Sequence, residues 1–382
     1  MKLAKLSLAA IVAVGAMTTF ASATPLEEAI KGVDLKGSMR YRVDINDPES
    51  KTKASSDNHR FSGSFTFTIP VAENVKSIMT LGYDTVSGDR DASSVGTDEE
   101  NFAVTQAYFQ YATAEYVVNA GKMMLSTPWT YDNLFDGQRA NGVLGMYKGI
   151  EGWTFAGAAF FNTDDGRNGR GILGNKENFY TAAAIGSMGP VNAQIWAAKL
   201  DHVFKHSVFA ELSTKLAGFT LKGQVNQMKL EEEGVAKFAT KDDSGTFWAV
   251  QAGYAIDAFN FGAGYHKTDK DMGIYALAAD HKMIRAGKQI YSKNVNKADT
   301  ETYFVTAGYK VNDFAFGAGY VKAEQDKAAI AGATSDFDMD EWYVDAAYKY
   351  SKNFTVAGYY SALEMDDKKG NDRIRIEAVY KF

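Results

Sequence analysis

The sequence predicts an all-β fold, a transmembrane antiparallel β-barrel of 18 strands, and three observations support it. Segments of about ten residues alternate apolar with polar side chains. Short turns and long polar connections follow one another between these segments, and the last segment ends the chain on an aromatic residue, Phe382. A period of two places the two kinds of side chain on opposite faces of a strand. Lipid then meets the apolar face, and water meets the other.

The composition excludes several classes of protein. The chain has 382 residues, a net charge of −6 and no Cys. Without Cys there is neither a disulfide framework nor a thiolate metal site. The acidic balance argues against a nucleic-acid partner, which needs a basic face. A large barrel of this length forms one domain.

Residues 1–23 are predicted to be a signal peptide. Lys2 and Lys5 form a positively charged region, an apolar core follows, and Ala21-Ser22-Ala23 fits a cleavage site. The alternative, a membrane anchor, is disfavoured because the apolar core is short. Residues 24–382 then form a single exported domain. No later stretch approaches the roughly 20 apolar residues of a spanning helix, so this domain is either soluble in the periplasm or a barrel in the outer membrane.

Eighteen segments show the alternation in order along the chain, with short turns on the periplasmic rim and long loops on the extracellular rim. In the first, Leu35, Tyr41 and Val43 alternate with polar neighbours. The predicted strands are 35–45, 59–69, 75–84, 101–111, 116–124, 140–147, 153–162, 177–187, 191–200, 206–216, 219–230, 246–256, 259–267, 300–311, 314–324, 341–350, 354–364 and 372–382.

A diverged hairpin repeat also favours a barrel. The segment 252–265 recurs at 307–320, and in each copy a Tyr precedes the tight turn and a Phe follows it. Such aromatic residues form a belt at a bilayer interface. The alternative is a soluble β-sandwich. A soluble core of this size should contain some fully apolar strands, whereas the second face is expected to stay polar throughout.

Lipid cannot hydrogen-bond an open sheet edge. The first strand, 35–45, must therefore pair with the last, 372–382. At this strand number side chains no longer fill the interior, so an aqueous channel is expected.

The third long loop, 125–139, is unusual because it combines apolar residues with carboxylates. Its apolar members are Trp129, Tyr131, Leu134 and Phe135, and its acidic members are Asp132 and Asp136. We expect this loop to fold into the barrel, with its apolar side on the wall and its carboxylates toward the lumen. The alternative is an external loop that makes subunit contacts.

Five arginines are predicted to face that loop as one basic patch, because closure makes their strands neighbours. A transverse field between them and the loop carboxylates would sort solutes at a pore constriction. The alternative is the ordinary polarity of any water-facing wall. The five residues are Arg40, Arg42, Arg60, Arg373 and Arg375.

Other chemistry has weaker support in the sequence. The segments 162–168 and 336–341 are rich in oxygen ligands, although neither matches a complete calcium loop. His202 and His206 are four residues apart, but in a strand–loop context this spacing does not bring them onto one face, as it would on a helix. None of the five His lies in a sequence context of an activated nucleophile, so we expect no enzyme.

Several motifs together resemble the porins of the Campylobacter-type major outer membrane protein family. They are Met1–Leu8, Ala23–Lys31, a run containing Val33, Asp34, Gly37, Arg40, Tyr41 and Arg42, the segment Ala120–Lys122 followed by the third-loop residues Trp129, Thr130, Asp132, Asn133, Asp136 and Gly137, and the ending Val379–Phe382.

This resemblance implies a homotrimeric general-diffusion porin with mild cation selectivity, surrounded by outer-membrane lipid and lipopolysaccharide, whose third loop constricts each pore. It also raises the expectation of a bound Ca²⁺, for which no ligands can be aligned. The segment 268–299 has no counterpart in the resemblance, and 274–290 is interpreted as a short helix.

The expected function is passive passage of ions and small hydrophilic solutes. Two alternatives remain open: a substrate-specific channel with a ladder of arginines and aromatic residues, and a plugged structural or adhesin barrel.

Overall fold

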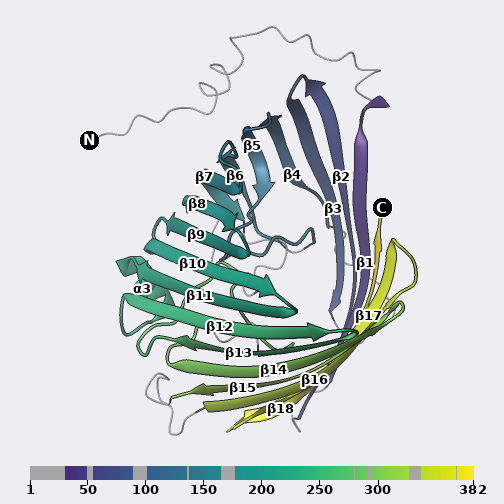
Figure 1. The fold of residues 1–382 in the computed structure, drawn as a ribbon, viewed down its shortest axis with the longest axis vertical. Helices are drawn as coiled ribbons and strands as arrows, with labels where there is room; N and C mark the ends of the chain where they lie inside the picture. The colour runs from purple at the N-terminus through teal and green to yellow at the C-terminus, as the bar shows by residue number, and fades with distance from the viewer. Residues whose placement is uncertain are drawn as a thin grey trace.

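The computed structural model describes residues 31–49, 55–88, 101–135, 137–164, 177–278, 280–290, 295–326, 337–366 and 368–382. Within them, one antiparallel sheet of 18 strands closes into a barrel (Figure 1). The strands are β1 (Asp34–Pro48), β2 (Ser56–Ala72), β3 (Val75–Gly88), β4 (Asn101–Ala112), β5 (Tyr116–Met124), β6 (Arg139–Tyr147), β7 (Trp153–Asp164), β8 (Phe179–Met188), β9 (Val191–Leu200), β10 (Phe204–Leu216), β11 (Phe219–Leu230), β12 (Ser244–Ile256), β13 (Phe259–Thr268), β14 (Thr300–Val311), β15 (Phe314–Gln325), β16 (Phe337–Lys349), β17 (Phe354–Met365) and β18 (Lys368–Lys381). The predicted fold class and strand number are confirmed.

The barrel closes between its first and last strands, as the sequence predicts. β1 pairs with β18 in an antiparallel register that sets Tyr41 opposite Ala378. The backbones of Gly37 and Phe382 also exchange two hydrogen bonds, of 2.9 and 3.0 Å. The carboxyl end of the chain therefore lies beside β1 (Figure 1). The sheet has no open edge, which satisfies the backbone inside a bilayer.

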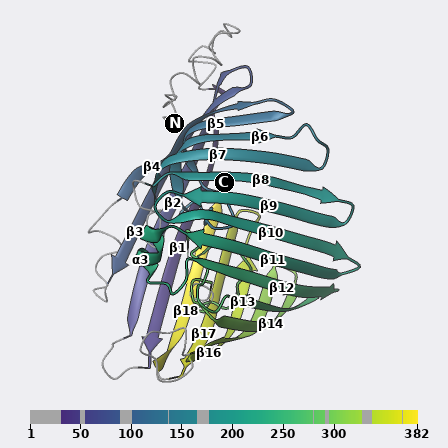
Figure 2. The ribbon, with the colours of Figure 1, turned by 90° about the vertical axis from the view of Figure 1, so that its left-hand side faces the viewer.

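Large apolar side chains cover the outside of the barrel. Phe219 and Phe259, for example, are 56% and 49% exposed. Near the short turns the rings meet in cross-strand pairs, such as Phe259 with Tyr309 at 4.8 Å and Phe314 with Tyr348 at 4.5 Å. These are the predicted Tyr and Phe residues that flank each turn. Figure 2 shows the strands β5 to β12 running side by side in this wall.

No helix in the described part of the chain is long and apolar enough to cross a membrane. The signal peptide predicted at 1–23 lies outside the described residues.

Several strands extend beyond the predicted ranges. β16 begins at Phe337 and β18 at Lys368, each four residues before the sequence prediction. Strand pairing continues past the apolar band, because polar residues there still find backbone partners on the neighbouring strand. Most of the connection predicted at 365–371 therefore belongs to the two strands, since β17 ends at Met365 and β18 begins at Lys368.

The short helix expected at 274–290 is not present in the described residues of that range, which form bends, turns and irregular backbone. Their backbone amides bond other segments instead: Ala278 donates to the Trp129 carbonyl and Lys282 to the Pro128 carbonyl, each at 3.0 Å. A short helix occurs elsewhere, as α3 (Glu232–Phe238). The apolar spacing reflects burial on several sides of an irregular segment, not one helical face.

The expectation that the inner face stays polar throughout is wrong for one part of the wall. From β6 to β9 the strand register places Leu144 opposite Ala158, and Ala156 opposite Ala183. These side chains share the inner face with Trp196, which lies opposite Ala183. Part of the lumen wall is therefore apolar.

Candidate functional site

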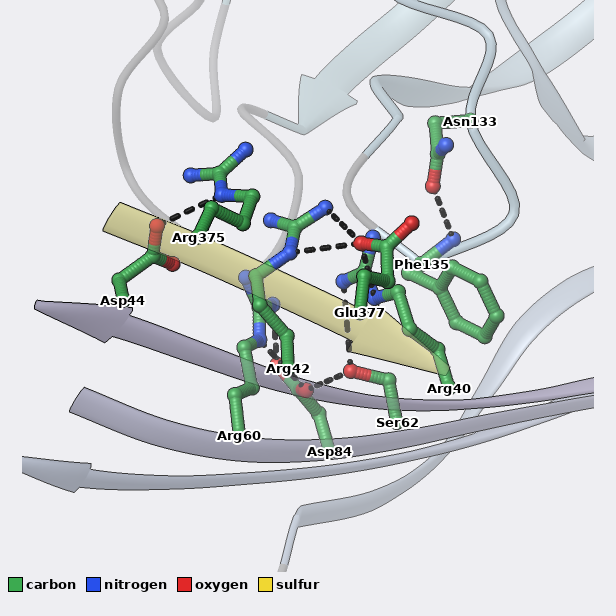
Figure 3. A network of polar contacts seen from close by, with 10 residues as sticks. All are labelled: Arg40, Arg42, Asp44, Arg60, Ser62, Asp84, Asn133, Phe135, Arg375 and Glu377. Atoms are coloured by element: carbon green, nitrogen blue, oxygen red, sulfur yellow. Dashed lines mark hydrogen bonds and ion pairs between the residues drawn. The ribbon is translucent and has the colours of Figure 1, made fainter. Parts of the chain in front are cut away.

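Five arginines, Arg40, Arg42, Arg60, Arg373 and Arg375, lie on three adjacent strands at the closing seam and are called the arginine wall below. β18 pairs with β1, and β1 pairs with β2. The register sets Arg42 directly opposite both Arg60 and Glu377, so these side chains share one face of the sheet. Figure 3 shows four of the arginines turned toward carboxylates of the same wall.

Arg60 and Asp84 form a bidentate ion pair on β2 and β3. The Arg60 Nε and Nη2 atoms donate to the two carboxylate oxygens at 2.8 and 2.5 Å, and the Ser62 hydroxyl adds a third bond at 2.7 Å. Both side chains are largely buried. A fork-to-fork pair of this kind fixes the plane of the guanidinium.

The other arginines share two further carboxylates. Arg42 donates to Glu377 at 2.8 Å. Arg375 donates to Asp44 at 2.6 Å, and the Arg373 guanidinium lies 3.5 Å from the same carboxylate. The arginine wall thus lies against three carboxylates, Asp44, Asp84 and Glu377, which neutralise part of its positive charge.

Arg40 joins this wall to the third loop. Its side chain is buried and contacts Ser62 at 3.4 Å. Its guanidinium stacks on the Phe135 ring, 4.3 Å from the centroid. The Asn133 side chain accepts a hydrogen bond from the Phe135 backbone and so shapes the loop at this contact (Figure 3). A desolvated cation–π contact of this kind contributes about 2 kcal/mol.

The third loop also contacts the opposite part of the sheet. Leu125 and Gln138 close its neck with a backbone bond of 2.9 Å. Trp129 is fully buried, and its indole donates to Asn226 of β11 at 2.8 Å. With Phe135 against β1, the loop reaches from β11 to β1, and its path runs inside the ring of strands (Figure 1).

The acidic group of this loop is paired within the lumen. Asp132 accepts a bond from the Lys282 ammonium at 2.6 Å and one from the Ser126 hydroxyl at 2.9 Å. Partial burial by itself raises the pKa of Asp132, but these hydrogen bonds and the positive charge outweigh it and hold the pKa below its usual value. Asp136, the second predicted carboxylate, lies outside the described residues.

The segment that supplies Lys282, residues 269–290, is the part of the lumen that sequence reasoning missed. It is attached to β16, where the buried Glu341 carboxylate accepts three backbone bonds from Lys288, Gln289 and Ile290 at 2.6 to 3.0 Å. The Gln289 side chain reaches the Ser361 hydroxyl at 3.0 Å. The sequence signal was a run of apolar residues inside a long loop.

Lys288 extends the positive charge beyond the arginine wall. Its ammonium lies 3.1 Å from the Asp345 carboxylate and over two rings, 4.6 Å from the centroid of Tyr343 and 5.4 Å from that of Tyr359. Arg375 contacts the Tyr359 ring as well, at 5.5 Å. Cations and aromatic rings therefore alternate from the 269–290 segment to β18.

The structure offers no metal cluster in its described part: no group of three or more His, Asp or Glu there is arranged to hold an ion. Of the two calcium candidates, 165–168 and residue 336 fall outside that part. His202 contacts Glu233 at 2.6 Å in a turn where both side chains are exposed. A bound calcium ion therefore stays a prediction.

The fold resembles solved outer-membrane channels. Pseudomonas aeruginosa OccK2 (OpdF), whose structure holds glucuronate, has a TM-score of 0.74 and 12% identity over 92% of this chain and 98% of that one. Pseudomonas aeruginosa OccK9 (OpdG) has a TM-score of 0.74 and 15% identity, over 93% of this chain and 99% of that one. A BenF-like porin from Pseudomonas fluorescens has a TM-score of 0.72 and 15% identity, over 92% of this chain and 99% of that one. No curated protein sequence matches the chain.

A closed 18-stranded barrel with an apolar exterior and a charged interior is the architecture of an outer-membrane porin, and the family match supports that class. More particularly, the model of the Campylobacter major outer membrane protein family matches residues 1–382. The chain belongs to that family, and the predicted resemblance is confirmed.

Proposed function

We propose that the protein is a passive channel for ions and small hydrophilic solutes, narrowed by the third loop and by the 269–290 segment. One observation carries this proposal: the two segments meet inside the barrel, through the Asp132–Lys282 ion pair and two backbone bonds. Each is also attached to the wall, through Trp129 to Asn226 and through the 288–290 amides to Glu341. Together they form the constriction.

The charges of this constriction are arranged as pairs. The arginine wall, Asp132, Lys282 and Lys288 all have opposite charges beside them. Near balance gives only mild selectivity between small ions, since a paired charge has a weak field beyond its partner. The proposed preference is for cations, in line with the acidic balance of the whole chain.

Planar-bilayer recording of the purified protein tests the proposal. A linear conductance that rises with salt, and a reversal potential of the cation-selective sign in a KCl gradient, are expected. The absence of any single-channel current would instead support the plugged structural barrel. An anion-selective potential would overturn the charge preference and leave the channel in place.

A substrate-specific channel is the second candidate, favoured by the ladder of Lys288, Tyr343, Tyr359 and Arg375. Cations stacked on aromatic rings along a wall can pass an anionic solute from one to the next. Among structures of similar fold, OccK2 holds glucuronate. Saturation of the ion flux at a low concentration of one organic anion would favour this candidate over general diffusion.

The homotrimer, the lipopolysaccharide surroundings, the calcium ion and the cleaved signal peptide belong to the same proposal. Crosslinking in intact outer membranes would test the trimer, and the amino-terminal sequence of the purified protein would test cleavage before Thr24.

A further inference from the structure

A pocket of about 470 Å³ opens on the apolar part of the lumen wall, between that wall and the two inner loops. We propose that it is a binding subsite for a compact solute that carries an aromatic ring and a short zwitterionic end. The inference rests on the proposed channel function, because the solute reaches the pocket through the lumen.

The floor and sides of the pocket are apolar. Phe160 and Phe209 are almost completely buried, and both line it. Ala156 and Ala183 face each other across β7 and β8 and leave room above themselves. A cavity of about 150 Å³ already holds benzene, so this pocket has space for an aromatic ring and its substituents.

Hydrogen bonds fix the orientation of the Trp196 indole inside the pocket. Its indole nitrogen donates to the Gln194 side chain at 2.8 Å, and Gln194 in turn donates to Glu211 at 3.0 Å. Both polar groups line the pocket with Trp196. This chain of bonds fixes the orientation of the indole, whose face can pack against an aromatic ring of the solute.

Charged groups of both signs border the apolar floor. The Lys282 ammonium has three N–H donors, and within the described residues two of them have partners, Asp132 and Ser126. The third can serve a carboxylate. The Glu211 carboxylate also lines the pocket; it accepts from Gln194 and Gln224 and lies 3.7 Å from the Lys222 ammonium, and its remaining lone pairs can accept from a second ammonium. This complementarity selects a zwitterionic end over a purely anionic one.

An apolar patch in a water-filled channel is not needed for passive ion flow, which depends on polar walls. Ligand pockets of about 300 to 1,000 Å³ are mostly apolar with a few placed polar groups. The present pocket has that size and composition, and it lies beside the constriction, where every solute must pass.

The test compares L-phenylalanine with L-serine, which has the same charged groups but no ring. In bilayers containing the wild-type protein, L-phenylalanine should reduce the ion current saturably, and L-serine at equal concentration should not. Equal effects of the two would overturn the subsite and leave the channel standing. No ion current at all would overturn both proposals.

Two variants locate the effect. Ala156→Leu and Ala183→Leu each fill the pocket from a different strand, and either should raise the half-blocking concentration of L-phenylalanine by roughly tenfold or more, since a lost ring contact of about 1.4 kcal/mol is a factor of ten. The matched control is Ala357→Leu, on the inner face of β17 opposite Glu377, which should leave the block unchanged. Block that is unaltered in both pocket variants would place binding elsewhere.

Discussion

At the level of single residues, charges inside the lumen are held in opposed pairs. Asp132 and Lys282 come from different loops, 150 positions apart in the chain, and their side chains join at 2.6 Å. Both are only partly buried, so the pair contributes modestly to stability. In the proposed channel, its effect is to balance the field between the two inner segments.

Removing the acidic member should change ion selectivity. In Asp132→Asn the Lys282 ammonium loses its counter-charge, so the reversal potential in a KCl gradient should shift toward anions. The double variant Asp132→Asn/Lys282→Met removes both charges and should return the potential close to that of the wild type. A wild-type reversal potential in the single variant would exclude this loop from the constriction.

His281 makes the packing of the inner segment dependent on pH. It is fully buried, and within the described residues neither ring nitrogen has a hydrogen-bond partner. Burial, and then the neighbouring Arg285 and His266, lower its pKa from 6.5 to about 3.

Because burial lowers the pKa of His281, the segment packs most stably while this imidazole is neutral. Above about pH 6.5 the imidazole is neutral in both the packed and the released segment, so packing has its full stability. Between that value and about pH 3 the released segment takes up a proton that the packed segment cannot, which weakens packing by about 2 kcal/mol at pH 5.

We therefore expect current fluctuations from segment release to become more frequent from pH 7 to pH 5. His281→Leu should abolish that dependence, because it leaves no group to protonate at this position. Recordings at both pH values in the two proteins check this, and an identical pH response in the variant would contradict it.

At the level of elements, Glu341 of β16 is one of the groups that attach the inner segment 269–290 to the wall. Glu341 of β16 accepts the backbone amides of three successive residues and the Ser361 hydroxyl at 2.6 Å. A buried amide that loses its acceptor costs about 1 to 3 kcal/mol. Glu341 therefore holds the end of the segment, residues 288–290, against β16.

Glu341→Leu should release the segment and widen the pore. The mean single-channel conductance and the open-channel noise should both rise, and Glu341→Gln, which keeps one acceptor oxygen, should fall between the variant and the wild type. Glu364→Leu on neighbouring β17 is the control, because Glu364 is exposed and makes none of these bonds. A conductance unchanged in Glu341→Leu would show that the segment does not narrow the pore.

At the level of the whole molecule, stability depends on closure of the sheet. The seam between β1 and β18 ends in the two Gly37–Phe382 backbone bonds and in the contact of the Phe382 and Phe65 rings at 6.0 Å. A Cβ at Gly37 would meet the outer end of the Phe382 ring, so the ring would have to shift from its present position.

Deleting Phe382 should lower the stability of the folded barrel by about 2 to 4 kcal/mol, through two lost hydrogen bonds and a lost ring contact. The temperature to which samples must be heated before the folded band disappears from the gel measures this loss. Phe382→Leu keeps the backbone bonds and should lose less. Equal losses in the two variants would assign the whole effect to the ring.

Much of the fold could be predicted from the sequence, whereas only part of the site could. The arginines of the closing strands were predictable neighbours, because closure requires their strands to pair. Their carboxylate partners could not be assigned without the register. The Trp129–Asn226 bond joins residues 97 positions apart and leaves no local pattern.

The sequence by itself determined the number of strands, which face of each strand is apolar, and the pairing of the first strand with the last. The two-residue period can be read within each segment, and lipid cannot hydrogen-bond an open sheet edge, so the edge strands must pair. Only the tertiary structure decided what occupies the lumen: the Lys282 partner of Asp132, the anchoring of 269–290 on Glu341 and the apolar wall of β6 to β9. The physical reason is that contacts across the lumen depend on shape and distance between distant segments, which side-chain periodicity does not record.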